Sequence, residues 1–514
     1  MPSSFRLHSR YNPQREADNF ANTVSGSPLY IVITEPGESY LATSFRKRFP
    51  CAKIFAIRYT DSLFLDSDSL FDAVWRGKPD GIPFFLINHI PDEYFSRCVF
   101  LSWLASENVW QQEAKAVWSE IKKASEIFLS IINTRSFFGK TWLKNIFRNL
   151  IFANKVTKVD LKAMEKPSFF LTSGTSLEEL IKDGQVRNVL NHSFTLASSS
   201  SLSSLAHHGV KPSCAIATDG GFWAEPHLKC LQDVPLLFPL EARIPYAVLE
   251  HAALGFVSYG SMLENYFFDV LKIPYLLAKR NGTVAGSGIE LLLEYTKGEI
   301  YISGLDLSFS NGFTHARPNE NMQTNLVCDG RLNPSSSILA HSQFSHLSLS
   351  TYASWFSSMN EQKKIRLRRI GEAGLDIEGV ERVRKEELGS LLTQREDIVM
   401  MEVEVARDER RMEVLAFLDK METNIRYDDF FDALVTTNEK TVERDVCELL
   451  AFSDYIALLK NTEADDGCAC GKNEEGRKEK EMSIAKSKQL MREKVLQFIE
   501  KEKRIIREIM KCGE

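Results

Sequence analysis

Short apolar runs and helix-periodic segments alternate along the first 300 or so residues of the chain. Residues 29–34 (LYIVIT) and 52–58 (AKIFAIR) are apolar runs of strand length, and residues 40–49 between them carry apolar side chains at helical spacing. A strand, a helix and a second strand in this order form a βαβ unit, from which parallel sheets are built. The pattern therefore predicts an α/β protein, and from about residue 360 onward it changes to charged, helix-periodic segments.

Three consecutive strands of a second α/β region end in small, hydroxyl or carboxylate residues. The predicted strands span residues 168–172, 194–197 and 213–218. The residues that follow them are Ser173, Gly174, Thr175 and Ser176 after the first strand, Ser199 after the second and Asp219 after the third. Because the carboxyl ends of parallel strands meet at one edge of a sheet, we expect these residues to gather there around a ligand.

A helix-strand unit at residues 281–316 adds a further segment to this edge. Thr283 is the predicted N-cap of a helix that Gly298 ends, and small residues from Gly282 onward leave room for a ligand at the first turn. Residues 299–303 form the next strand, and Asp306 follows at its carboxyl end. The unit predicts a phosphate-binding helix start and a carboxylate at the same edge, although an ordinary αβ unit with a solvated aspartate has the same pattern.

Changes in pattern and composition divide the chain into seven parts. We expect a tail at 1–28, an N-terminal α/β domain at 29–134, a connecting amphipathic helix at 135–165, a central domain at 166–358, a helical region at 359–460, a polar linker at 461–482 and a terminal helix at 483–514. The terminal helix carries an apolar stripe, so we expect it either to dock on the rest of the chain or to form a homo-oligomer.

Composition excludes several classes of protein. The 69 acidic and 63 basic residues among 514 give a net charge of −6, which differs from the basic footprint of a nucleic-acid-binding protein. No apolar run approaches the roughly 18 residues of a membrane-spanning helix, and the first residues lack the apolar segment of a signal peptide. We therefore expect no membrane span and a cytoplasmic protein. Nine cysteines without framework spacing fit reduced thiols.

Six segments, taken in order, resemble one protein family. They are FGKTWLKNIFRNL, KPSFFLTSGTSLEEL, HHGVKPSCAIATDG, GTVAGSGIELLLEY, ISGLDLSFSNGFTHA and IGEAGLDIEGVERV, within about residues 130–390. The family is the motility-associated factor proteins, flagellin nonulosonic-acid glycosyltransferases whose central part is similar to bacterial sialyltransferases and to 6-hydroxymethylpterin diphosphokinase-like proteins. The resemblance implies an α/β fold with a Rossmann-like central domain and a mainly parallel sheet, a smaller N-terminal α/β domain and an α-helical C-terminal region.

The resemblance also implies which residues bind the donor nucleotide. They are Ser173, Gly174, Thr175, Ser176, Ser199, Asp219, Gly282, Thr283 and Asn311. Thr175 stands where the family usually has proline, and Ser199 stands where it has an acidic residue, whereas Asp219 matches. The loop at residues 173–176 is implied to hold the nucleotide phosphate, and Asp306 to line the site.

Two histidines compete for the role of general base. An enzyme of this kind must deprotonate the acceptor hydroxyl, and a histidine suits that task near neutral pH. His341 precedes a predicted helix and resembles the position of the base in the sialyltransferases, while His315 in the segment THA is the alternative. By residue type alone, Tyr259 and Tyr266 are candidate hydrogen-bond donors to the leaving phosphate.

The function implied by the resemblance is an inverting transfer of a nonulosonic acid from a CMP-sugar to a serine or threonine hydroxyl of flagellin. The expected partners are flagellin and the nucleotide-sugar donor, with no further cofactor. The central domain has no Asp-x-Asp motif, so a metal is not strictly implied. Two alternatives stay open: a pterin diphosphokinase-like enzyme, and a non-catalytic flagellin-binding assembly factor, which the serine at position 199 favours.

Overall fold

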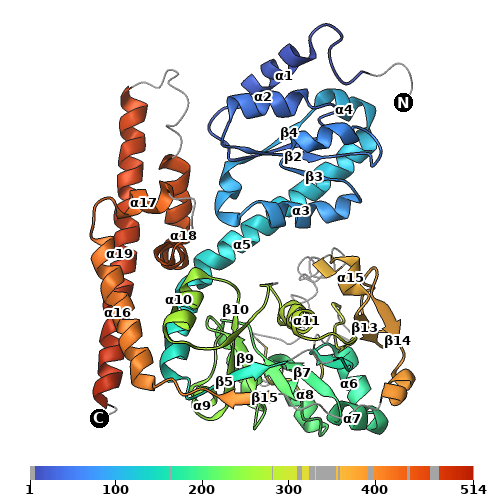
Figure 1. Ribbon diagram of the computed structural model, residues 1–514, viewed down its shortest axis with the longest axis vertical. Helices are drawn as coiled ribbons and strands as arrows, with labels where there is room; N and C mark the ends of the chain where they lie inside the picture. The colour runs from blue at the N-terminus through green and yellow to red at the C-terminus, as the bar shows by residue number, and fades with distance from the viewer. Residues whose placement is uncertain are drawn as a thin grey trace. The chain divides into compact units, whose positions relative to one another are not determined.

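The chain forms two compact units (Figure 1). The computed structural model describes residues 6–161, 165–280, 282–308, 315–322, 330–331, 355–356, 359–391, 399–436, 440–462 and 474–512. The first unit comprises residues 1–137, 428–438 and 450–495, and the second comprises residues 138–427, 439–449 and 496–514. Three helices contribute to both units: α5 (Gln111–Phe152), α18 (Val442–Thr462) and α19 (Glu474–Cys512).

The first unit is built on a parallel sheet with the strand order β3-β2-β1-β4. Its strands are β1 (Tyr30–Thr34), β2 (Lys53–Ile57), β3 (Ala73–Trp75) and β4 (Cys98–Ser102). The alternating side chains of these strands enter two apolar cores, one shared with α1 (Pro13–Asn22) and α2 (Tyr40–Arg48), the other with α3 (Ile82–His89) and the first half of α5. The remaining elements are η1 (Leu65–Leu70), η2 (Pro79–Gly81), η3 (Asp92–Arg97), α4 (Leu104–Val109) and α17 (Phe430–Thr436).

The second unit is built on an 11-stranded sheet. The strand order is β14-β13-β12-β6-β7-β8-β9-β10-β5-β15, with β11 also paired to β10, and only the pairing of β15 with β5 is antiparallel among those described. The strands are β5 (Lys155–Asp160), β6 (Ser168–Leu171), β7 (Phe194–Ser198), β8 (Cys214–Ile216), β9 (Leu236–Pro239), β10 (Ala253–Ser258), β11 (Tyr275–Leu277), β12 (Ile300–Ser303), β13 (Leu367–Ile370), β14 (Glu381–Val383) and β15 (Val399–Glu402).

Helices connect these strands, and α16 (Arg407–Ile425) follows the last of them. The connecting helices are α6 (Thr175–Ile181), α7 (Gly184–Asn191), η4 (Ser199–Ser201), α8 (Leu202–His207), η5 (Phe222–Leu228), α9 (Tyr246–His251), α10 (Met262–Val270), α11 (Val284–Tyr295), α15 (Glu361–Lys364) and η6 (Lys385–Leu391). α11 packs on the sheet because Ile289 and Leu292 enter one core with Phe170 of β6 and Leu196 of β7.

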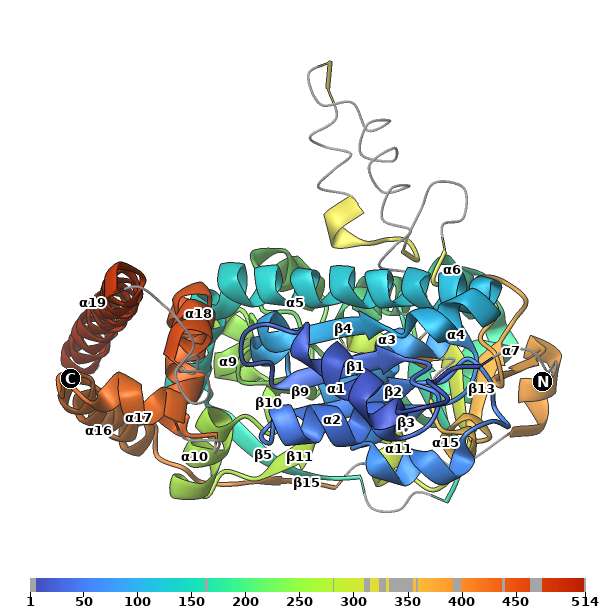
Figure 2. The same ribbon diagram turned by 90° about the horizontal axis from the view of Figure 1, so that it is seen from above.

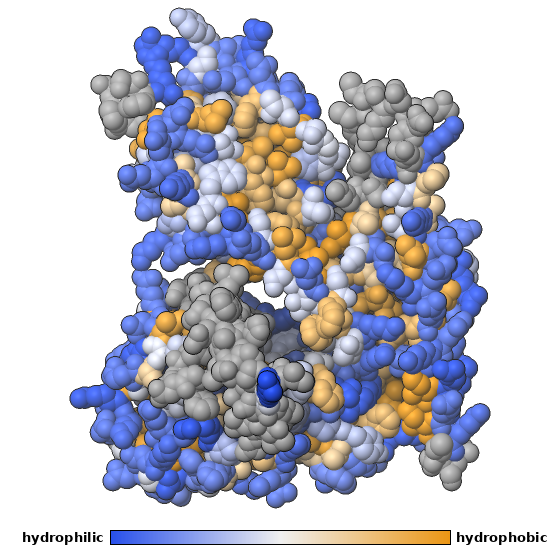
Figure 3. All heavy atoms as spheres, turned by 180° about the vertical axis from the view of Figure 1, so that it is seen from behind, coloured by the Kyte–Doolittle hydropathy of each residue, from blue (hydrophilic) through white to orange (hydrophobic). Residues whose placement is uncertain are grey.

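The fold class expected from the sequence is confirmed. The strands predicted at 168–172, 194–197 and 213–218 are β6, β7 and β8, and the strand predicted at 299–303 is β12. Thr283 is the N-cap of α11, since its Oγ1 accepts a hydrogen bond from Gly286 N at 3.0 Å. None of the described helices is both long and apolar enough to cross a membrane. On the face drawn in Figure 3, hydrophilic residues cover much of the described surface, with apolar patches between them.

The C-terminal half differs from the expectation in one respect. The region from residue 359 was expected to be helical, but it contributes β13, β14 and β15 to the large sheet before α16 begins. Charged residues occupy half or more of β13 and β14, where they pair across strands: Arg368 of β13 forms ion pairs with Glu299 at 2.8 Å and Glu381 at 3.3 Å. Such charges hide the period-two pattern that would have indicated strands.

Two helices also have bounds different from those expected. The connecting helix expected at 135–165 is the second half of α5, a single helix of 42 residues, and it is followed by β5, which the sequence pattern did not indicate. The terminal helix α19 buries Met491, Val495 and Phe498 of its apolar stripe within the chain. α16 and α19 lie side by side (Figure 2), where Lys503 Nζ lies 2.6 Å from Glu422 Oε2. The stripe therefore serves intramolecular docking.

Gly288 sets how closely α11 can approach β6. A Cβ at this position would lie 2.4 Å from Phe170 Cζ, a distance that requires the ring or the helix to shift. We expect Gly288→Ala to lower the free energy of unfolding by about 1–3 kcal/mol through overpacking, measured as a shift in the midpoint of chemical unfolding by circular dichroism.

The matched control is Gly184→Ala at the start of α7. A Cβ there would meet only Arg187 Nη2 at 3.6 Å, which is an ordinary contact. Replacing a helical glycine without a clash stabilises a protein by about 0.4–1 kcal/mol. If both variants had the same midpoint as the unaltered protein, the close packing of α11 on β6 would be wrong.

Candidate active site

The strand order of the large sheet defines a switch point between β6 and β12. After β6 the chain adds β7, β8, β9 and β10 on one side, and then returns to place β12 on the other side of β6. The loops after β6 and β12 therefore leave the sheet side by side at its carboxyl edge. In open α/β sheets ligands bind in the crevice at such a switch point. This edge is where the sequence analysis placed the ligand.

Asp306 joins the two loops at the switch point. Its side chain is buried, and its Oδ2 accepts hydrogen bonds from Ser176 N at 2.8 Å and Thr175 Oγ1 at 3.1 Å, while Ser176 Oγ donates to Oδ1. The carboxylate caps the first turn of α6 from 130 residues away in the chain. Gly174 permits this approach, because a Cβ there would lie 2.7 Å from Asp306 Oδ2.

The structure thus brings Asp306 together with the loop Ser173, Gly174, Thr175 and Ser176, as the sequence analysis expected. It also shows that the Ser176 amide already has an anionic partner from the protein itself. Phosphate binding by the loop stays a prediction. Any donor group at the loop must use atoms other than the Ser176 amide, or must displace the Asp306 carboxylate.

His315 is positioned beside the same loop. The next residue, Ala316, donates its N–H to Ser173 O at 2.7 Å, and Arg317 pairs with Glu178 of α6 at 3.0 Å. The His315 ring stacks on His227 of η5 with a centroid distance of 6.4 Å. Burial, with a smaller effect of His227, lowers the pKa of His315 to about 4. His315 is therefore a neutral imidazole at neutral pH, and a weaker base than a solvent-exposed histidine.

The loop after β7 is tied to the segment that carries His315. Asn319 is buried and donates from Nδ2 to Ser200 O at 3.2 Å, and Ser204 Oγ donates to Arg317 O at 2.9 Å. Ser199 is buried at the end of β7, next to the loop of β6 in strand order. Ser199 therefore belongs to the same edge, although the described contacts give it no assigned role.

The carboxyl edge continues from β8 to β11 with a cluster that the sequence analysis missed. Glu241, which follows β9, forms an ion pair with Arg280, which follows β11. The Arg280 guanidinium lies 5.2 Å from the ring centres of both Trp142 and Tyr259. Glu241 and Arg280 each follow a strand, as Asp219 does, so the strand-end rule that identified Asp219 was the signal that could have found them.

Tyr259 links this cluster to the start of α11. Its hydroxyl donates to Ser287 Oγ at 3.2 Å, and burial raises its pKa above the usual value, so it remains a proton donor at neutral pH. Thr283 and Gly282, which has a φ of +69°, lie at the same helix start. Tyr266 donates to Glu413 of α16 at 2.7 Å, so both tyrosine hydroxyls have a protein acceptor in place of the predicted phosphate.

The predicted site residues fall into two groups along one edge. Asp306, His315 and the loop at residues 173–176 lie at the switch point, whereas Gly282 and Thr283 lie at the start of α11. Asp219 is exposed at the end of β8, where its Oδ1 accepts from Gly221 N at 2.8 Å. Asn311 and His341 lie outside the described residues. No group of three or more potential metal-ligating side chains occurs within the described part of the chain.

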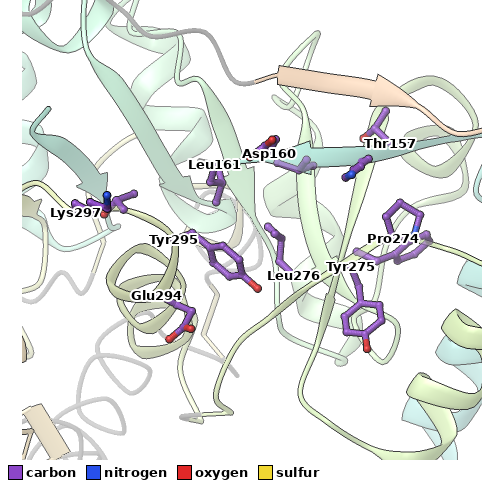
Figure 4. A pocket seen from close by; sticks show the side chains of 13 residues that line it. Thr157, Asp160, Leu161, Pro274, Tyr275, Leu276, Glu294, Tyr295 and Lys297 are labelled. Carbon is purple, nitrogen blue, oxygen red and sulfur yellow. The ribbon is translucent and has the colours of Figure 1, made fainter. Parts of the chain in front are cut away.

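A cavity of about 490 Å³ lies at the other end of α11. The first residues of β10, Ala253 and Leu254, pair with β5, and its later residues from Phe256 onward pair with β11. Residues of β5 and β11 line the cavity. Figure 4 shows the Tyr295 side chain directed into it, and the Tyr295 hydroxyl accepts a hydrogen bond from Leu277 N at 2.7 Å. None of the predicted site residues lines this cavity, which is about 18 Å, the length of the 12-residue α11, from Thr283.

A solved structure has the same fold as this chain. It is the MAf glycosyltransferase from Magnetospirillum magneticum AMB-1, with a TM-score of 0.50 over 97% of this chain and 88% of that chain. The sequences are 10% identical, so the likeness is one of fold.

Sequence comparison gives a closer relationship. No family model matches the chain. A protein of Treponema pallidum (strain Nichols), described as an uncharacterized protein, is 30% identical over 379 residues, which are 73% of this chain and 83% of the relative. With this identity over most of both sequences, the chain belongs to the same family as the Treponema pallidum protein.

Proposed function

We propose that the protein is a glycosyltransferase that moves a nonulosonic acid from a CMP-sugar to a serine or threonine hydroxyl of flagellin. The observation that carries the proposal is the position of His315 beside the β6 loop, at the switch point of a mainly parallel sheet. The fold shared with the MAf glycosyltransferase and the six sequence segments that resemble the motility-associated factors support it further.

In the proposed reaction His315 is the general base. The acceptor oxygen loses its proton to the imidazole and attacks the anomeric carbon, while the bond to the CMP phosphate breaks on the opposite face of the sugar. The configuration at the anomeric carbon is therefore inverted. The leaving phosphate is stabilised at the start of α11, where Thr283 caps the helix. The Tyr259 hydroxyl, which donates a hydrogen bond to Ser287, must turn toward the phosphate to stabilise it as well.

One structural observation favours the non-catalytic alternative. The Asp306 carboxylate occupies the Ser176 amide that the resemblance assigns to the nucleotide phosphate. A flagellin-binding factor that has lost its nucleotide site would tolerate this arrangement. The test must therefore separate binding from turnover.

The protein should be incubated with unmodified flagellin and a CMP-nonulosonate, and in parallel with ATP and hydroxymethylpterin. We expect the intact mass of flagellin to rise by one or more sugar residues, with stoichiometric release of CMP. Formation of pterin diphosphate and AMP would identify the kinase-like alternative instead. Flagellin binding without any mass change would identify the assembly factor.

Replacing the proposed base should affect turnover more than donor binding. We expect His315→Gln to lower kcat by about 100-fold or more, since general base catalysis typically contributes that much, with donor affinity unchanged. The matched control is His192→Gln, an exposed histidine at the C-cap of α7, which should have full activity. Equal kcat values for the two variants would assign the base to another residue.

The lowered pKa of His315 predicts an unusual pH dependence. Because the imidazole is already neutral well below its ordinary pKa of about 6.5, kcat/KM should stay level from about pH 7.5 down to about pH 5.5. Between about pH 6.5 and 4 the His315 side chain is protonated in the unfolded chain but not in the native protein. The free energy of unfolding should therefore decrease as the pH is lowered through that window. His315→Gln should reduce this slope, and an acid limb of kcat/KM centred at about pH 6.5 would contradict the assignment.

Asp306 is expected to act by fixing the loop after β6. We expect Asp306→Ala to lower the free energy of unfolding by about 1–2 kcal/mol through loss of the cap and to weaken donor binding at least about tenfold, measured by calorimetry. The control is Asp183→Ala, which removes the N-cap of α7, where Oδ1 accepts from Gln185 N at 2.9 Å. It should keep donor affinity, and unchanged donor affinity in Asp306→Ala would refute the site.

A further inference from the structure

Arg148 of α5 is a half-buried cation without a partner among the described residues. It makes no ion pair and no hydrogen bond there, and its Nη1 is shielded from solvent. Anion binding is more favourable at a guanidinium that has already lost part of its hydration than at a fully exposed arginine. Burial accordingly lowers the pKa of Arg148.

Two charged groups act on the pKa of Arg148 besides burial: Arg243, which follows β9, lowers it, and Glu225 of η5 raises it. Glu225 Oε1 already accepts a hydrogen bond from Arg243 Nε at 2.5 Å. The carboxylate of this cluster is thus bound by Arg243, and an additional anion would pair with Arg148.

This cluster lies at the carboxyl edge of the large sheet. Arg243 donates its N–H to Asp219 O at 2.9 Å, which places it beside the end of β8. Glu225 belongs to the same short helix as His227, whose ring stacks on the proposed base His315. An anion at Arg148 would therefore lie on the side of the edge where the proposed chemistry occurs.

The helix that carries Arg148 is fixed on this edge by its neighbours. Asn145 and Asn149 flank Arg148 on α5 and are both buried, and each donates two hydrogen bonds from Nδ2. Their acceptors, at 2.7–3.0 Å, are the carbonyl oxygens of Gly220 and Glu241 for Asn145 and of Leu240 and Ala242 for Asn149. Since the backbone under Arg148 is rigid, an anion can bind with little loss of conformational freedom.

We propose that Arg148, assisted by Arg243, binds the carboxylate of an acidic sugar at this edge. An arginine matches a carboxylate with two parallel N–H···O bonds, and a sugar carboxylate stays ionised at neutral pH. The choice of a carboxylate rests on the proposed function: a CMP-nonulosonate carries two anionic groups, a phosphate and a carboxylate beside the anomeric carbon. The phosphate is assigned to the start of α11, so the carboxylate requires a second cation at this edge.

The test measures binding without turnover, by ligand-observed NMR titration of the full-length protein. The probes are N-acetylneuraminate, its uncharged methyl ester, CMP and inorganic phosphate. We expect the free acid to bind at least about tenfold more tightly than the ester. Arg148→Gln should bind the acid at least about tenfold more weakly than the unaltered protein and should bind CMP equally well.

Two further variants make the result specific. Arg148→Lys keeps the charge but loses the bidentate geometry, so its affinity for the acid should lie between those of the unaltered protein and Arg148→Gln. Lys140→Gln removes an exposed charge from the same helix and should bind like the unaltered protein. Circular dichroism of all variants reports whether each is folded. If Arg148→Gln does not fold, Arg148→Lys still tests the site.

Three outcomes would overturn the proposal. They are equal binding of acid and ester by the unaltered protein, equal binding of the acid by the unaltered protein and Arg148→Gln, and a loss in Arg148→Gln of CMP or phosphate binding alone. The last would assign the anion at Arg148 to a phosphate. The binding titration contains no flagellin, so it does not depend on the transfer reaction. If the acid bound in an Arg148-dependent way but flagellin was not modified in the transfer assay, the proposed transfer would be refuted and this binding site would stand.

Discussion

The hydrogen bonds from Asp306 to the first turn of α6 are the interaction on which the candidate site depends. They join two loops that leave adjacent strands but lie 130 residues apart in sequence. The join is possible only where side chains are missing: a Cβ at Gly304 would lie 2.1 Å from Thr172 O, and one at Gly374 would lie 2.4 Å from Asp306 O. The geometry of the switch point is therefore set by glycine positions and one buried carboxylate.

Electrostatics along the edge separate supporting groups from groups able to bind a ligand. Arg317 and Arg280 each have a carboxylate partner, and such partly exposed pairs contribute about 0–1 kcal/mol apiece while they fix local geometry. His315 and Arg148 differ from them. One is held neutral by burial, and the other is charged without a partner among the described residues. The first is the proposed base and the second is the proposed anion-binding group.

A feature could be predicted from the sequence when the residues that form it lie close together along the chain. Thr283 was identified as an N-cap because a cap joins residues three positions apart, and β6, β7 and β8 were identified because buried parallel strands are continuous apolar runs. The partnership of Asp306 with Ser176 was not foreseeable from spacing, since strand order decides it. β13 was missed because its charged residues are satisfied across strands rather than along a helix.

The fold and the site carry different weight in assigning a function. Sequences that are 10% identical share this fold because the apolar pattern, which many residues can satisfy, determines how the strands and helices pack. A reaction, in contrast, needs particular side chains at particular positions. Ser199 carries no charge where the resembled family has an acidic residue, and the Ser176 amide is hydrogen-bonded to Asp306. The proposed transfer therefore depends on particular groups, above all the imidazole of His315 and the guanidinium of Arg148, which has no partner among the described residues.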